Sequence, residues 1–156
     1  MRIAHTEASC GWGGQEIRIL EEANGLIARG HQVSLICPKE APIFDRAAHY
    51  GVPAYALPIG RKNIAGLTAM YRWLKNHPVD VVNTHSSTDS WLVGLSCLAL
   101  SSPPKIVRSR HISAPVSPNR SSRWLYGKSA SHVVTTGEKL RLQLIKDLDL
   151  KPENVT

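Results

Sequence analysis

The sequence predicts an α/β fold, a doubly wound and mostly parallel Rossmann-like sheet. Short apolar runs rich in β-branched residues alternate with amphipathic segments of about ten to fifteen residues, which is typical of βαβ units. Glycine or proline stands at most of the junctions between them. The length of 156 residues and the hydrophobic content of 42% suit one domain with an apolar core. We therefore expect helices on both faces of a parallel sheet.

The expected strands are short apolar runs, and in chain order they are Arg2–Thr6, His31–Cys37, Val52–Pro58, Val79–His85, Lys105–His111 and His132–Thr136. Pro38 ends the second of these runs, because proline offers no N–H to a sheet. The fourth run is nearly continuous in β-branched residues, which is typical of a strand buried on both faces.

The expected helices have apolar residues at helical spacing, and they are Gln15–Arg29, Pro42–Tyr50, Asn63–His77, Ser86–Leu100, Arg120–Lys128 and Gly137–Leu148. Gly30 and Gly51 follow the first two, where a residue without Cβ accepts the left-handed conformation. Pro78 blocks extension of the third. The fourth opens on serine, threonine and aspartate, which are capping residues.

Ligands of such sheets bind at the carboxyl ends of the strands, beside the point where the strand order reverses. This rule selects four loops, which are Glu7–Gly14, His85–Asp89, His111–Asn119 and Thr136–Glu138.

The first loop, with Gly11, Gly13 and Gly14, precedes a helix whose free N–H groups and dipole favour an anion. Its spacing is not the G-x-G-x-x-G of dinucleotide sites, nor is it a P-loop. Pro38 and Lys39 stand after the second strand, where an NAD site carries an acidic residue. The loop is therefore either an anion-facing turn or a packing device. The next residues, Gln15 and Glu16, are either ligand contacts or ordinary residues of a helix start.

Polar side chains follow the fourth and fifth strands. His85 is followed by Ser86, Ser87, Thr88 and Asp89, a density of hydroxyl groups that suits a sugar site and equally suits a capping cluster. His111 ends the fifth strand and is expected to face the same crevice, where its imidazole would bond a hydroxyl or a phosphate.

Two other sets of polar residues border the expected crevice. Arg108 and Arg110 alternate along the fifth strand and so share one face of the sheet. In the last loop Thr136 is expected to cap a helix with Glu138 in its first turn, and a role in the site is the second interpretation.

The formal net charge of +7 predicts an anionic partner, and no nucleic-acid motif accompanies it. On the helix Asn63–His77 the expected core stripe is Ile64, Leu67, Met70, Tyr71 and Leu74. Trp73 falls about 120° from that stripe at 100° per residue. An anionic membrane surface is expected to contact this tryptophan and its basic neighbours Arg61, Lys62, Arg72 and Lys75. A solvated helix face is the alternative.

Neither a metal nor a disulfide is indicated, since Cys10, Cys37 and Cys97 are far apart and form no CxxC pair. The chain begins without a signal-peptide pattern, and no apolar run reaches the roughly 20 residues of a membrane span. We expect a cytoplasmic protein, bound peripherally on the inner face of the membrane where the basic helix docks.

Taken in order, the segments "HTEASCGWGGQEIRILEEANGLIARGHQVSLIC", "VDVVNTHSSTDSW", "RSRHISAPV" and "HVVTTGEKL" resemble bacterial family 4 glycosyltransferases of the lipopolysaccharide and cell-surface glycan type. The resemblance covers residues 1–156. It implies two Rossmann-like domains across a cleft, of which this chain is similar to the N-terminal, acceptor-side one. The C-terminal domain, which binds the nucleotide sugar, is expected to be absent from this chain.

The resemblance also implies a reaction, in which a sugar passes with retention from a nucleotide diphosphate sugar to a hydroxyl of a glycan or lipid-linked acceptor. No metal and no cofactor besides this substrate is implied. Gly13 and Gly14 would face the donor diphosphate, and His111 would be the catalytic residue beside the transferring sugar. The implied acceptor-binding residues are Gln15, Glu16, His85, Ser86, Ser87, Asp89 and Arg110. The competing interpretations are a non-catalytic module that binds anions or membranes and a fragment of a sugar-nucleotide epimerase.

Overall fold

The computed structural model describes residues 1–112 and 114–156, and Ser113, in the predicted loop His111–Asn119, lies outside them. The described residues form a six-stranded sheet of β1 (Arg2–Thr6), β2 (Gln32–Cys37), β3 (Ala54–Ala56), β4 (Val81–Thr84), β5 (Lys105–Arg110) and β6 (His132–Thr135). Every neighbouring pair is parallel, and the spatial order is β3-β2-β1-β4-β5-β6. This order confirms the doubly wound fold and places its reversal between β1 and β4.

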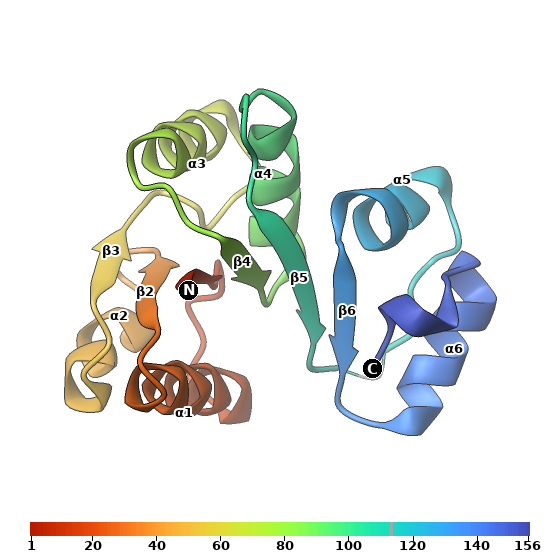
Figure 1. The fold of residues 1–156 in the computed structure, drawn as a ribbon, viewed down its shortest axis with the longest axis horizontal. Helices are drawn as coiled ribbons and strands as arrows, with labels where there is room; N and C mark the ends of the chain where they lie inside the picture. The colour runs from red at the N-terminus through yellow and green to blue at the C-terminus, as the bar shows by residue number, and fades with distance from the viewer. Residues whose placement is uncertain (113) are drawn as a thin grey trace.

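The α-helices are α1 (Gly14–Ala28), α2 (Pro42–Arg46), α3 (Ile64–Asn76), α4 (Ser87–Leu98), α5 (Arg120–Arg123) and α6 (Glu138–Leu148). Helices α1 and α2 cover one face of the sheet and α3 and α4 cover the other, so the sheet is the middle of three layers (Figure 1). The face toward α1 is filled by a cluster that includes Ile3, Ile19 and Leu35. The face toward α3 is filled by a second cluster around Ile36, Met70 and Val82.

Three predicted elements are shorter or more irregular than expected. The segment Pro42–Tyr50 is α2 followed by a 3-10 turn (Ala47–Tyr50), which Gly51 closes with a φ of 66°. The segment Arg120–Lys128 is one turn of α5 followed by a π-helix (Trp124–Ser129). Strand β3 keeps only Ala54–Ala56, because it is an edge strand flanked by prolines that donate no ladder hydrogen bond. Near the end of the chain, after a 3-10 turn (Pro152–Asn154), Val155 pairs in parallel with Val133 of β6.

The orientation of α3 corrects one prediction. Trp73 is only 6% exposed and packs in the core, whereas Ile64, which was expected in the core stripe, is 80% exposed. The buried residues Gly66, Met70, Trp73 and Leu74 recur at helical spacing and form the face that meets the sheet. Gly66 lets α3 lie close to the loop that precedes it, since a Cβ there would lie 2.9 Å from the carbonyl oxygen of Pro58. Trp73 was therefore wrongly predicted to contact a membrane.

Candidate functional site

The carboxyl ends of β1 and β4 lie side by side at the reversal point. The amide of Glu7 donates to the carbonyl of Ile36 at 3.0 Å, and the amide of His85 donates to the carbonyl of Thr6 at 3.2 Å. The backbone thus remains paired just beyond the strands. This arrangement brings the glycine loop, the loop after β4 and the start of the loop after β5 to one edge of the sheet, as the sequence predicts.

The glycine loop leaves open space in front of helix α1. Gly13 is the N-cap of α1, with an extended backbone (φ −172°) that any residue adopts. A Cβ built on Gly14 would meet no described atom within 4 Å, and one on Gly13 would meet only Glu16 Oε2 at 3.8 Å. Neither backbone strain nor packing within the described chain therefore demands glycine at these two positions. Packing therefore explains neither Gly13 nor Gly14, whereas at Gly11 a Cβ would lie 3.2 Å from the hydroxyl oxygen of Ser9.

The first backbone amides of α1 border this space and have no partner within the helix. The first hydrogen bond of α1 joins the amide of Ile17 to the carbonyl of Gly13 at 3.2 Å, so the amides of Gly14, Gln15 and Glu16 precede the helical ladder. Together with the positive end of the helix dipole, they suit an anion. Glu16 is 6% exposed as a residue, and its carboxylate lies near Gly11 and Gly13, which leaves little of it for a ligand.

The buried carboxyl group of Glu7 holds the glycine loop by hydrogen bonds. Glu7 is fully buried, accepts a hydrogen bond from the amide of Ser9 at 2.7 Å and accepts another from the side chain of Gln15. Burial, and then the neighbouring carboxylate of Asp89, raise the pKa of Glu7 to about 7. The Gln15 side chain, predicted as an acceptor contact, is thus engaged by Glu7.

Three histidines from β1, from the end of β4 and from the end of β5 form a hydrogen-bonded chain. His5 Nδ1 lies 2.9 Å from His85 Nε2, and His85 Nδ1 lies 2.8 Å from His111 Nε2. The first two rings stack at 8° with centroids 5.2 Å apart, and the second pair stacks at 29° and 5.1 Å. His5 and His85 are buried, while His111 is half-buried at the edge of the site.

The three imidazoles are neutral at pH 7. Burial lowers the pKa of His5 to about 4 and the pKa of His85 well below its ordinary range. Burial, with Arg18 and Arg108, lowers the pKa of His111 to about 4. Burial and these two arginines thus favour the neutral form of His111.

Asp89 caps a helix and is not a ligand contact, which corrects its predicted role. It is fully buried, and its two oxygens accept hydrogen bonds from the hydroxyl of Thr6 at 2.5 Å and from the amides of His85 at 3.0 Å and Ser86 at 2.8 Å. The amide of Asp89 donates in return to the Ser86 side chain, and this reciprocal pair is a capping box for α4. The hydroxyl of Ser86 also donates to Asp89. Burial raises the pKa of Asp89. The structure thus places Ser86 and Asp89 in the capping cluster that was the alternative interpretation.

Two of the predicted acceptor residues line one hollow. Ser87 and Arg110 border a hollow of about 280 Å³ that also contains Trp91, Asn119 and Tyr126. Arg110 donates to the hydroxyl of Tyr126 at 3.2 Å, which orients its guanidinium along the wall of the hollow. Hydroxyl, amide, guanidinium and aromatic groups at this place suit a hydroxylated ligand.

The remaining predicted residues lie apart from this site. The cap of α6 is Gly137 and not Thr136, and Thr136 and Glu138 line a separate hollow of about 510 Å³ beside that helix. Arg61, Lys62, Arg72 and Lys75 are exposed in and before α3.

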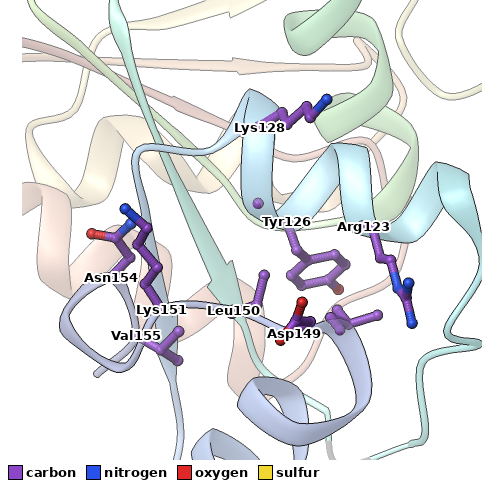
Figure 2. Close-up of a pocket in the computed structure, with 10 residues that line it drawn as sticks. Arg123, Tyr126, Lys128, Asp149, Leu150, Lys151, Asn154 and Val155 are labelled. Carbon is purple, nitrogen blue, oxygen red and sulfur yellow. The ribbon is translucent and has the colours of Figure 1, made fainter.

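Figure 2 shows another hollow, of about 400 Å³, whose lining residues include Arg123, Tyr126, Asp149 and Val155. None of its lining residues belongs to the four loops selected from the sequence. It shares Tyr126 with the hollow that contains Ser87 and Arg110.

Residues 1–112 and 114–156 contain neither a cluster of metal-ligating side chains nor a helix that could span a membrane. No group of three or more histidine, cysteine, aspartate or glutamate side chains there is arranged to hold a metal ion. In the same part of the chain, no helix combines the length and the apolar composition that crossing a bilayer requires.

Sequence reasoning missed His5 and Glu7 as members of the site. His5 stands inside the apolar run of the first strand, so its neighbours in the sequence indicate only a buried strand. Its relation to His85 depends on strand pairing across 80 residues. Glu7 belongs to a loop that was selected, and its position directly after the first strand was the available signal.

A comparison with protein families identifies the family of this chain. The model described as Glycosyltransferase Family 4 matches residues 12–156. The chain belongs to this family. No protein of curated function matches the chain.

The family 4 chain also resembles solved glycosyltransferase structures. A glycosyltransferase from Rickettsia africae superposes with a TM-score of 0.78 at 16% identity, over 99% of this chain and 41% of its own. The apo form of the lipopolysaccharide outer core galactosyltransferase WaaB superposes at 0.76 and 12% identity, over 100% of this chain and 44% of its own. Anabaena Alr3699/HepE, solved with UDP and glucose, superposes with a TM-score of 0.76 at 14% identity. The match covers 100% of this chain and 43% of the HepE chain.

These likenesses show the fold, and the family 4 chain spans less than half the length of each of these structures. The predicted family is confirmed by the match to its model.

Proposed function

We propose that this chain is the acceptor-side half of a retaining, metal-independent glycosyltransferase. The complete enzyme moves a sugar from a nucleotide diphosphate sugar to a hydroxyl of a glycan or lipid-linked acceptor. A hexose is the first sugar to test. Membership of family 4 favours a glycosyltransferase. It argues against the two competing interpretations, a non-catalytic anion-binding module and an epimerase fragment. The observation that carries the proposal beyond the family is the open space before α1, which free amides line at the same edge as His111.

The chemistry follows from this arrangement. As the glycosidic bond to diphosphate breaks, negative charge grows on the leaving group and positive charge on the anomeric carbon. Oriented N–H groups stabilise such a developing anion without reorganisation, and the amides at Gly14 and Gln15 are placed to contribute. His111, neutral and half-buried, offers a ring nitrogen to the donor sugar. The hollow that contains Ser87 and Arg110 receives the acceptor hydroxyl group.

The proposal is tested by transfer of a labelled sugar from a panel of nucleotide diphosphate sugars. The chain alone is expected to be inactive, and a chimera that supplies a donor-side Rossmann-like domain is expected to transfer the label with the anomeric configuration retained. Transfer by the chain alone would contradict the assignment as one half of the enzyme. Failure of every donor with a folded chimera would contradict the transferase itself.

We also propose that the enzyme works on the inner face of the membrane, in assembly of lipopolysaccharide or another cell-surface glycan. The exposed side chains Arg61, Lys62, Arg72 and Lys75, with Ile64 at 80% exposure among them, support this docking surface. WaaB, a fold neighbour, is a lipopolysaccharide outer core galactosyltransferase, which makes that role the first to test.

Substituting Arg72 and Lys75 together by alanine is expected to weaken binding to vesicles of anionic lipid by about thirtyfold, because each basic side chain contributes about 1 kcal/mol near such a surface. Sedimentation with anionic and with neutral vesicles measures this. Lys146→Ala, on the exposed part of α6, is the matched control and should bind as the unmodified protein does. Binding that does not depend on anionic lipid would contradict the docking proposal.

A further inference from the structure

The three histidines lie at successive register positions on neighbouring strands of the sheet. His5 of β1 pairs with Asn83 of β4, and His85 stands two residues beyond Asn83. Asn83 in turn pairs with Val107 of β5, and His111 stands four residues beyond Val107. Because side chains alternate along a strand, all three share one face, each two residues nearer the carboxyl edge than the last. The chain of imidazoles therefore runs from the buried interior to the site.

Each contact in this chain joins one N–H to one lone pair. A neutral imidazole carries one of each, so the two contacts force the three rings into the same tautomer. Either every proton is on Nδ1, and the chain donates outward from His5 to His111, or every proton is on Nε2, and it donates inward. Only the Nδ1 of His111 is left for a ligand in both cases.

The inner end of the chain distinguishes the two cases. His5 is fully buried, and its Nε2 has no hydrogen-bond partner among residues 1–112 and 114–156. With the protons on Nε2, this end would be a buried N–H without an acceptor, which folded proteins strongly avoid. With the protons on Nδ1, this end is an unpaired lone pair of a neutral ring. The second arrangement is the less costly one.

We propose that His5 and His85 are positioning residues that hold His111 in its Nδ1–H form, so that His111 acts toward its ligand as a hydrogen-bond donor. For the ligand, this inference rests on the proposed function, which supplies a hydroxyl or phosphate oxygen of the nucleotide sugar. His111 cannot then serve as a base toward the acceptor, because its Nε2 lone pair is occupied by His85 and its Nδ1 carries the proton. The positive groups Arg18 and Arg108 oppose any further proton on the chain.

The protein labelled with ¹⁵N-histidine tests this directly. Two-bond ¹H–¹⁵N correlation spectra distinguish a protonated ring nitrogen from a bare one. At pH 7 we expect His85 and His111 to show a protonated Nδ1 and a bare Nε2. A protonated Nε2 on His111, or a rapidly exchanging mixture of both forms, would overturn the inference.

Two substitutions add a functional readout in the active two-domain enzyme. His85→Asn keeps an amide N–H at the place of Nδ1 and is expected to retain the Nδ1–H form of His111 and most of kcat. His85→Leu removes the donor, so His111 should shift to the Nε2–H form that free histidine prefers, and kcat should fall about tenfold with little change in KM, the size of one lost hydrogen bond. Equal kcat in both variants, with both folded, would overturn the positioning role.

The wild-type spectrum decides the tautomer even where leucine in this buried position prevents folding. It also separates the two proposals. If His111 is protonated on Nε2, the proposed tautomer is refuted while the proposed sugar transfer stands. If His111 is protonated on Nδ1 and no sugar is transferred, only the proposed enzyme function is refuted.

Discussion

Gly14→Val is expected to lower the kcat of the active two-domain enzyme by about a hundredfold, the loss typical of a removed oxyanion-type contact. The valine side chain would point into space that no described atom occupies, so it should obstruct a ligand while disturbing the fold little. Steady-state kinetics with the nucleotide sugar, and a melting curve of the same sample, measure the two effects. The melting temperature is expected to change by only a few degrees, because valine is no less favourable in a helix than the glycine it replaces.

Ala28→Val is the matched control, since it places the same side chain at the exposed last residue of α1. It should retain full kcat. Unchanged turnover in Gly14→Val would contradict the placement of the donor diphosphate at the glycine loop. A large drop in melting temperature would show instead that the loop is closed by packing.

Glu7→Gln is expected to stabilise the protein at pH 8 and to have a much smaller effect at pH 5. Burial and the carboxylate of Asp89 raise the pKa of Glu7 to about 7 in the fold, above its ordinary value of 4.5. The folded state therefore binds more protons than the unfolded state between these values, and the wild type loses stability as the pH rises through 7. Glutamine cannot ionise, so the variant escapes this loss.

The free energy of unfolding, from urea denaturation, should favour Glu7→Gln by about 2–3 kcal/mol more at pH 8 than at pH 5. Glu21→Gln, on the exposed side of α1, is the control and should show no such pH dependence. A benefit of Glu7→Gln that is equal at both pH values would mean that Glu7 ionises normally in the folded protein.

The loops of the site were predictable because a parallel sheet binds its ligands at the carboxyl ends of its strands, which lie at one edge. The alternation of strands and helices, with Gly30, Gly51 and Pro78 at junctions, indicates that sheet, and the rule of the reversal point then selects the loops with Gly14, His85 and His111. The structure confirms that these loops lie at one edge. The family was predictable from the order of its motifs and is confirmed by the family match.

The roles of single side chains were less predictable. Trp73 and Ile64 are both apolar and lie on the same helix, and only the docking of α3 on the sheet decides which of them is buried. Asp89 carries the same chemistry as a sugar-binding residue and as a helix cap. The hydroxyl of Thr6, contributed by β1, lies 2.5 Å from its carboxylate and shows which role it fills.

By itself, the sequence determined the fold class and the edge of the sheet that carries the site, because periodicity and turn chemistry act over a few residues. Only the tertiary structure decided that His5, His85 and His111 form one chain and that Glu7 lies beside Asp89. Those contacts depend on the register between strands separated by up to 80 residues. Register is set by the packing of the whole sheet, and no local pattern contains it.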